Sequence, residues 1–205
     1  MKRLLLAALL FVLPSVAFAD GNVWNDSFNK AKKTLEQQVY YDHRVTLYCG
    51  ATFDEKKNVT LPEGFTVSKH EKRAGKVEWE HVVPAENFGQ TFAEWREGDA
   101  QCVDNRGKAF KGRKCAEKVN KDYRYMQADL YNLYPAIGAV NALRQNYNFQ
   151  MLPGEKPDFG SCEMKIADRK AEPPVRARGQ IARTYKYMAD DVSGGSVGMH
   201  ESETC

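Results

Sequence analysis

The sequence predicts a single domain that mixes helices with strands and is held together by disulfides. Helical and strand-like hydrophobic patterns alternate along the chain, and neither an internal repeat nor a linker divides it. The 186 residues that follow a predicted signal peptide are enough for one sizeable core. All five cysteines follow that peptide, and disulfides persist in the oxidising compartment that an exported protein reaches.

The first residues have the layout of a secretory signal peptide. Lys2 and Arg3 give a positive start, residues 4–13 are apolar without interruption, and a small-x-small cleavage site ends at Ala19. The apolar run is too short to span a bilayer, and no other stretch approaches that length. We therefore expect residues 1–19 to be removed, leaving a periplasmic or secreted protein without membrane contact.

Overall charge gives only weak support for a polyanionic partner. The chain has 30 basic and 27 acidic residues, a formal net charge of +3. Removal of Lys2 and Arg3 with the signal peptide lowers the net charge to +1. Any binding of nucleic acid must therefore depend on a local basic patch.

The first hundred residues predict two helices and two strands. Apolar residues recur at helical spacing over 28–39, and residues 44–48 have the composition of a short strand. A polar, turn-rich connection over 54–76 follows. Alternating polar and apolar residues predict a strand over 76–83, and apolar residues at i, i+4 and i+7 predict a helix over 88–95.

The second half predicts a basic loop, two helices and a strand. The loop over 99–114 contains Cys102 and ends directly before Cys115, and the closeness of these two cysteines in sequence favours a local disulfide. A helical pattern over 125–147 is interrupted by Pro135, which fits the first turn of a helix better than its interior.

A half-buried strand is expected over 162–166, and Pro173-Pro174 opens a last helix. Residues 190–205 are rich in glycine and serine, and we expect them to form a flexible tail.

Four segments that follow one another along the chain carry a family resemblance. They are residues 78–85 (EWEHVVPA), 112–115 (GRKC), 129–138 (DLYNLYPAIG) and 162–185, the last beginning with CEMK. Together they resemble the endonuclease I family of periplasmic and secreted bacterial nucleases. The resemblance covers about residues 24–189 and assigns a nuclease domain to residues 20–189.

The resemblance implies an α+β fold, a single mixed domain built around a ββα-metal motif of the His-Me finger type. It implies that His81 is the general base and that Arg113 holds the substrate phosphate. Glu80 and Asn132 become the ligands of Mg²⁺, in whose place other divalent ions are possible.

The chemistry of these side chains fits the implied roles. Imidazole titrates near neutral pH and can take a proton from an attacking water. Carboxylate and amide oxygens are hard ligands that suit Mg²⁺. An arginine offers phosphate two parallel donors, which a lysine cannot reproduce.

The function implied is an exported, metal-dependent endonuclease that hydrolyses phosphodiester bonds of DNA and, by the same logic, RNA. We expect it to act as a monomer, and the resemblance implies products with 5′-phosphate ends. We expect no sequence specificity, because every proposed group addresses phosphate rather than base edges. Lys114, Arg176 and Arg178 are the expected further contacts to nucleic acid. The competing interpretations are a solvated Arg113, an Asn132 that caps a helix, and arginines on a solvated helix face with internal salt bridges.

The sequence leaves the disulfide pairing and three other functions open. Family members often carry a second cysteine where this chain has Ala51, which explains an odd cysteine count. Cys102 is expected to pair with Cys115, and Cys49 with either Cys162 or Cys205. The competing functions are a nucleic-acid binder without catalysis, a hydrolase of another phosphodiester, and a disulfide-stapled interaction protein.

Overall fold

A computed structural model describes residues 21–194, so the predicted signal peptide lies outside the described residues. The helices are α1 (Phe28–Thr34), the π-helix η1 (Leu35–Val39), α2 (Glu71–Ala74), α3 (Ala85–Gly89), α4 (Ala93–Arg96), α5 (Arg113–Val119), α6 (Lys121–Gln127), the 3-10 helix η2 (Leu130–Asn132), α7 (Gly138–Arg144) and α8 (Val175–Gly194). The strands are β1 (Thr52–Phe53), β2 (Val59–Thr60), β3 (Val77–His81), β4 (Leu133–Ile137), β5 (Asn148–Phe149), β6 (Lys165–Ala167) and β7 (Lys170–Glu172). No helix in this part of the chain is long and apolar enough to cross a membrane.

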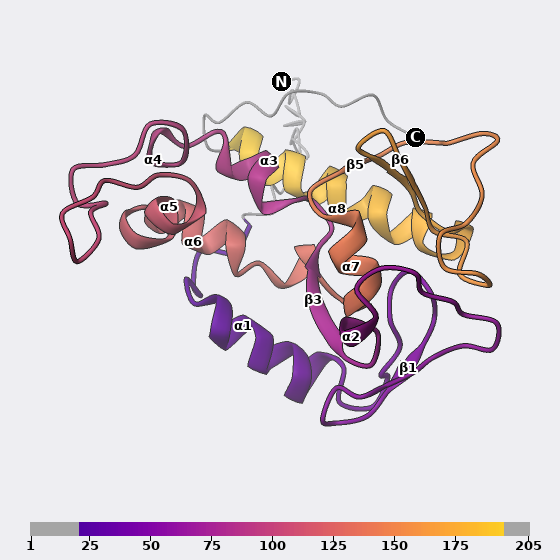
Figure 1. Cartoon of the computed structure of the whole chain (residues 1–205). Helices are drawn as coiled ribbons and strands as arrows, with labels where there is room; N and C mark the ends of the chain where they lie inside the picture. Colours follow the sequence, from indigo (N-terminus) through magenta and orange to yellow (C-terminus); the bar gives the residue numbers. More distant parts are fainter. Residues whose placement is uncertain (1–20, 195–205) are drawn as a thin grey trace, which may run out of the picture.

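The centre of the molecule is an antiparallel pair of strands followed by a helix (Figure 1). β3 pairs with β4 in a register that places Val77 opposite Ile137 and His81 opposite Leu133. α7 begins at Gly138, directly after β4, and contacts both strands. The predicted strand over 76–83 is thereby confirmed as β3, and its partner comes from a segment more than fifty residues away.

The interrupted helical pattern expected over 125–147 is confirmed only in part, and the first-turn position expected for Pro135 is wrong. This stretch forms the end of α6, then η2, β4 and α7, and Pro135 lies in the middle of β4 opposite Trp79. Proline lacks an amide donor and is tolerated in strands that are not fully paired. The carbonyl of Pro135 accepts a hydrogen bond of 2.8 Å from the amide of Leu47, so this position satisfies its remaining polar group.

Two other predicted elements differ from the structure in the first half of the chain. Residues 44–48 contribute only an isolated bridge at Val45 before a turn, because Thr46 and Gly50 close that turn with a backbone hydrogen bond. The predicted helix over 88–95 divides into α3 and α4. The predicted helix over 28–39 is confirmed as α1 and η1, with Ser27 as its N-cap.

The predicted C-terminal helix is confirmed at its start, and in the structure it extends further than expected. α8 begins at Val175, directly after Pro174, and continues to Gly194. Residues 190–194, expected in a flexible tail, therefore belong to the helix, and the rest of that tail lies outside the described residues. The strand expected over 162–166 forms slightly later, as β6.

The largest hydrophobic cluster joins the central strands to the C-terminal part of the chain. Buried side chains of β4 and α7 pack with Ala171 of β7 and with Ala177 and Ile181 of α8. β7 lies between β5 and β6 in a three-stranded sheet, and α8 runs beside that sheet (Figure 1). The disulfide Cys49–Cys162 links this region to the turn after residue 45, which settles one of the two pairings expected for Cys49.

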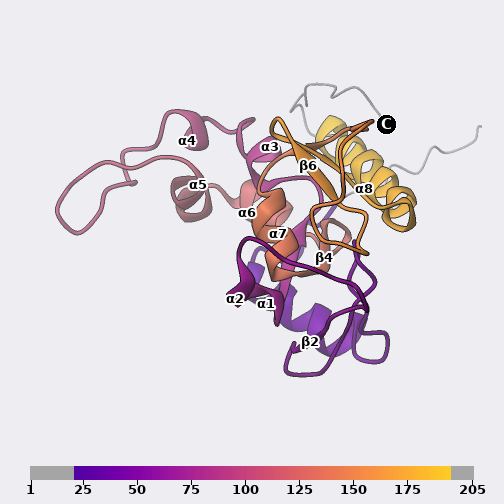
Figure 2. The same ribbon diagram turned by 45° about the vertical axis from the view of Figure 1, so that its right-hand side comes forward.

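A second disulfide stabilises an arm that projects from the body (Figure 2). α4, α5 and the loop between them form this arm, and Cys102 is bonded to Cys115 across 13 residues of sequence. The pairing expected for these two cysteines is thus confirmed. Because Cys115 lies in the first turns of α5, the disulfide anchors the helix that begins with Arg113. The fold is a mixed α+β domain with two disulfides among its described residues.

Candidate active site

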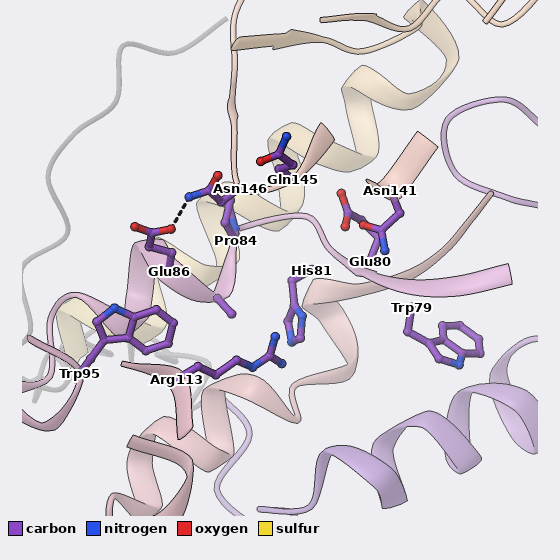
Figure 3. Close-up of a pocket in the computed structure, with 11 residues that line it drawn as sticks. Trp79, Glu80, His81, Pro84, Glu86, Trp95, Arg113, Asn141, Gln145 and Asn146 are labelled. Carbon is purple, nitrogen blue, oxygen red and sulfur yellow. Dashed lines mark hydrogen bonds between the residues drawn. The ribbon is translucent and has the colours of Figure 1, made fainter. Parts of the chain in front are cut away.

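A pocket of about 310 Å³ lies where the end of β3 meets α3, α5 and α7 (Figure 3). It contains three of the four side chains expected to carry the chemistry. Its lining residues are Trp79, Glu80, His81, Pro84, Ala85, Glu86, Trp95, Arg113, Asn141, Gln145 and Asn146.

The hydrogen bond of His81 fixes its tautomer. Nε2 lies 2.9 Å from the carbonyl oxygen of Gln127, and because a carbonyl can only accept, Nε2 must carry the proton. In the neutral ring the other nitrogen, Nδ1, is therefore an unprotonated base. Burial lowers the pKa of His81 to about 4, and the positive charges of Arg113 and Arg144 act in the same direction. His81 is consequently in its basic form at neutral pH.

Glu80 is buried and held at one of its two oxygens. Oε1 accepts hydrogen bonds from the hydroxyl of Tyr48 at 2.8 Å and from Nη1 of Arg144 at 2.9 Å. Both contacts use Oε1, so among the described residues Oε2 is the oxygen that remains for a ligand in the pocket. Burial raises the pKa of Glu80, and Arg144 is the main group that opposes this shift. A cation in the pocket would also favour the charged form.

Arg144 anchors the whole end of β3. Its side chain is fully buried, and besides Glu80 it donates to the carbonyl oxygens of His81 at 2.9 Å and of Val82 at 2.7 Å. The arginine is the last residue of α7, so these bonds fasten the helix to the strand that carries the site. Glu80 and His81 thus owe their positions to a residue that the sequence did not single out.

Asn141 of α7 lines the pocket close to Glu80 (Figure 3). Its Nδ2 donates a hydrogen bond of 2.8 Å to Oε2 of Glu78. An ionised carboxylate only accepts, so the amide NH₂ group must face Glu78. The carbonyl oxygen Oδ1 is therefore the end of the amide that Glu78 does not occupy, on a side chain that lines the pocket.

Asn132, the second metal ligand expected from the sequence, does not line the pocket. Its side chain is fully buried, its Oδ1 accepts from the amide of Val83 at 2.7 Å, and its Nδ2 donates to the carbonyl of Val83 at 2.9 Å. Both ends of the amide are used to hold the chain just after β3. The structure thus does not bring Asn132 together with Glu80 and His81 in the pocket, and Asn141 is the asparagine that lines it.

Arg113 reaches the pocket from the arm. It is exposed at the start of α5, and its guanidinium points toward His81 (Figure 3). The ring of Phe28 lies 5.7 Å from the Arg113 guanidinium carbon and 5.1 Å from the His81 ring, measured to the ring centroid. Phe28, the first residue of α1, therefore packs against both side chains and limits how far they can move. Lys114, the next residue, is exposed on the same helix.

The two arginines expected to grip nucleic acid from α8 make contacts within the chain. Arg176 donates to the carbonyls of Thr46 and Leu47, at 2.9 and 2.5 Å. Arg178 forms an ion pair of 3.0 Å with Glu172. Neither lines the pocket. The structure thus favours the competing interpretation of internal contacts for Arg176 and Arg178.

The oxygen atoms of the pocket fit a hard divalent cation. Glu80 and Asn141 offer one carboxylate and one amide oxygen, and Mg²⁺ accepts few protein ligands because it keeps several of its waters. Within residues 21–194, no three His, Cys, Asp or Glu side chains gather as metal ligands, so a zinc-type site has no basis in this part of the chain.

Comparison with known proteins assigns the chain to a family. A family model described as Endonuclease I matches residues 24–193. An extracellular deoxyribonuclease of Aeromonas hydrophila is 37% identical over 176 residues, which cover 82% of this chain and 71% of that protein. A periplasmic deoxyribonuclease of the same organism is 35% identical, over 80% of this chain and 66% of its own length. Endonuclease-1 of Buchnera aphidicola subsp. Acyrthosiphon pisum is 36% identical, over 80% of this chain and 62% of its own length.

The chain is therefore a nuclease of the hydrolase class. It belongs to the endonuclease I family, and the resemblance carried by the four motif segments is confirmed. The expected location, in the periplasm or outside the cell, is confirmed as well.

Several pocket residues were missed from the sequence. Asn141 is the most important of them. The sequence feature that could have identified it is its position as a polar residue one turn into a helix that follows directly on a strand. Gln145 and Asn146 line the pocket after α7, and Gln145 has φ 53° and ψ −128°, a conformation that normally favours glycine. No sequence pattern marks such a residue, because the conformation is imposed by the anchored end of α7.

Proposed function

We propose that this chain is a metal-dependent endonuclease that hydrolyses phosphodiester bonds of DNA and RNA without sequence specificity. The observation that carries the proposal is the unprotonated Nδ1 of His81, in a pocket that also contains Arg113 and the oxygens of Glu80 and Asn141. The deoxyribonuclease names of the relatives support DNA as a substrate.

His81 is the proposed general base. Its Nδ1 takes a proton from a water molecule as that water attacks the phosphorus atom. The hydrogen bond from Nε2 to the Gln127 carbonyl keeps the ring in the correct orientation and stabilises the positive charge that the ring acquires. The lowered pKa ensures that the base is not already protonated at neutral pH.

Arg113 is the proposed clamp on the scissile phosphate. Its guanidinium can donate two parallel hydrogen bonds to the phosphate oxygens, whose charge increases as the water attacks. The exposed position allows a polymer to reach it, and the Cys102–Cys115 disulfide restricts its movement. Lys114 lies next to it as a further contact to the phosphate backbone.

Glu80 and Asn141 are the proposed ligands of a divalent cation, with Mg²⁺ as the preferred ion. When bound there, such an ion supplies Lewis-acid stabilisation of the phosphate and of the leaving oxygen. The protein's part is to hold the two oxygens in place. Arg144 and Tyr48 do so for Glu80, and both are buried with it.

The proposed groups address features that every nucleotide shares. The base His81 and the clamp Arg113 both act at the phosphate, which carries no sequence information. Cleavage is therefore expected at any sequence. None of the named groups reads the 2′-hydroxyl, which extends the proposal to RNA. We place the broken bond between phosphorus and O3′, so the products carry a 5′-phosphate and a 3′-hydroxyl.

Cleavage of end-labelled DNA and RNA oligonucleotides tests these points together. We expect cuts at many sequences in both polymers, with products that a ligase joins without prior phosphorylation. A 5′-hydroxyl on the products would refute the assigned direction of cleavage. Retention of the oligonucleotides without any cleavage would instead indicate a binding protein.

A further inference from the structure

A chain of polar contacts leads from the surface to Asn141. Oε2 of Glu78 accepts the hydrogen bond of 2.8 Å from Nδ2 of Asn141. Both oxygens of Glu78 also accept hydrogen bonds from Arg73, one of them from Nε at 2.7 Å. Glu78 lies two residues before Glu80 on β3, so the two side chains leave the same face of the strand.

The orientation of the Asn141 amide decides whether it can serve as a ligand. The two ends of a carboxamide have nearly the same shape, but only the oxygen can bind a cation. A flip of the amide would present its NH₂ group to the ion and remove one of two protein ligands. Glu78 prevents this flip, because a flipped amide would set its oxygen against a carboxylate oxygen.

The backbone is built to bring Glu78 close to α7. A Cβ atom on Gly138, the first residue of α7, would lie 2.8 Å from Oε1 of Glu78 and 2.6 Å from the carbonyl oxygen of Arg73. No side chain fits at this position without moving one of them. Glycine at 138 therefore lets α2, which carries Arg73, and the start of α7 enclose the Glu78 carboxylate.

We propose that Glu78 is a positioning residue, which directs the oxygen of Asn141 toward the metal, and that Arg73 holds Glu78 in place. The inference rests on the proposed metal site and adds the groups that orient one of its ligands. Groups that orient a metal ligand from behind typically change metal affinity by about 10- to 100-fold when they are removed.

The test is a calorimetric titration of the oxidised, signal-free protein with Mg²⁺, in the absence of nucleic acid. Glu78→Leu removes both the acceptor and the charge, and we expect Mg²⁺ affinity to fall by about 10- to 100-fold. Glu78→Gln removes the charge but keeps an oxygen that can accept from Asn141, and it should recover most of that loss. Glu86→Leu is the matched control, because Glu86 lines the same pocket and accepts hydrogen bonds from Asn146 and Gln90 rather than from Asn141. It should bind Mg²⁺ within a few-fold of the wild type.

Equal losses in Glu78→Leu and Glu86→Leu would overturn the proposal, since charge alone would then explain the effect. So would an unchanged affinity in Glu78→Leu. Glu80→Ala and Asn141→Ala distinguish a failure of the positioning role from a failure of the metal site itself. Wild-type Mg²⁺ affinity in both of these variants would refute the metal site. Reduced Mg²⁺ affinity in both, together with wild-type affinity in Glu78→Leu, would refute only the positioning role. If Glu78→Leu does not fold, Arg73→Met tests the same chain of contacts, and unchanged affinity in that variant overturns the proposal.

Discussion

The buried arginine at the end of α7 allows a stability prediction that depends on the geometry of the site. Arg144→Met keeps an unbranched apolar side chain in place of the arginine stem but removes the guanidinium, with its charge and three hydrogen bonds, to Glu80, His81 and Val82. Neither partner of the ion pair is accessible, since the side chains of Arg144 and Glu80 are 1% and 4% exposed. The substitution therefore leaves a carboxylate in the interior without its cation.

Removing one partner of a buried ion pair lowers the free energy of unfolding by about 3–5 kcal/mol. The sign of the pH dependence follows from Glu80. Burial already raises its pKa in the folded protein, and Arg144 opposes this, so the variant raises the pKa further. A folded-state pKa above the unfolded value means that proton binding favours the folded state. The loss of stability should thus be largest at neutral pH and shrink as the pH falls through the folded pKa.

Urea unfolding of the oxidised protein, at neutral and at mildly acidic pH, measures both effects. Lys186→Met is the matched control, because its ion pair with Asp190 has the same length of 2.9 Å but is 77% and 60% exposed. An exposed pair of this kind contributes less than about 1 kcal/mol. A loss in Arg144→Met no larger than that of the control, or one that does not shrink in acid, would refute the reasoning.

Three further predictions concern the base, the pocket wall and the arm. With saturating metal, kcat/KM should stay level from neutral pH down through the ordinary imidazole range, because burial lowers the pKa of His81 to about 4. A midpoint near the ordinary imidazole value would contradict the assigned environment. Gln145→Gly should raise the free energy of unfolding by about 1 kcal/mol in urea, because it relieves the backbone strain at φ 53°; no gain would show that the strain is absent in solution. Replacing both Cys102 and Cys115 by serine should slow cleavage, because Arg113 loses its anchor; cleavage at the wild-type rate would refute that link.

The elements that could be predicted are those whose pattern is local. The alternation in β3, the helical spacing of α1 and the proline pair before α8 each describe a face or a boundary within one segment. The pairing of β3 with β4 depends on a register between distant segments, and no local pattern records it. The helical period over 125–147 was misleading because the apolar residues of β4 and α7 happened to continue one another's spacing.

The candidate site was predictable where the motif is contiguous. Glu80 and His81 are adjacent in sequence and lie in one pocket, as does Arg113. The choice between Asn132 and Asn141 could not be made, because an asparagine's role depends on which of its atoms are already bonded. Val83 occupies both ends of the Asn132 amide, and Glu78 occupies only one end of Asn141. The internal contacts of Arg176 and Arg178 were hidden for the same reason.

The most direct test of the central claim is digestion of a plasmid by the oxidised, signal-free protein. Wild type and His81→Ala are compared with Mg²⁺ and with EDTA, and binding of each protein to DNA is followed by gel retardation. We predict degradation by the wild type with Mg²⁺, none with EDTA, and almost none by His81→Ala, which should still bind DNA. Activity of His81→Ala within a few-fold of the wild type would contradict the role of His81, and equal digestion in EDTA would contradict the metal.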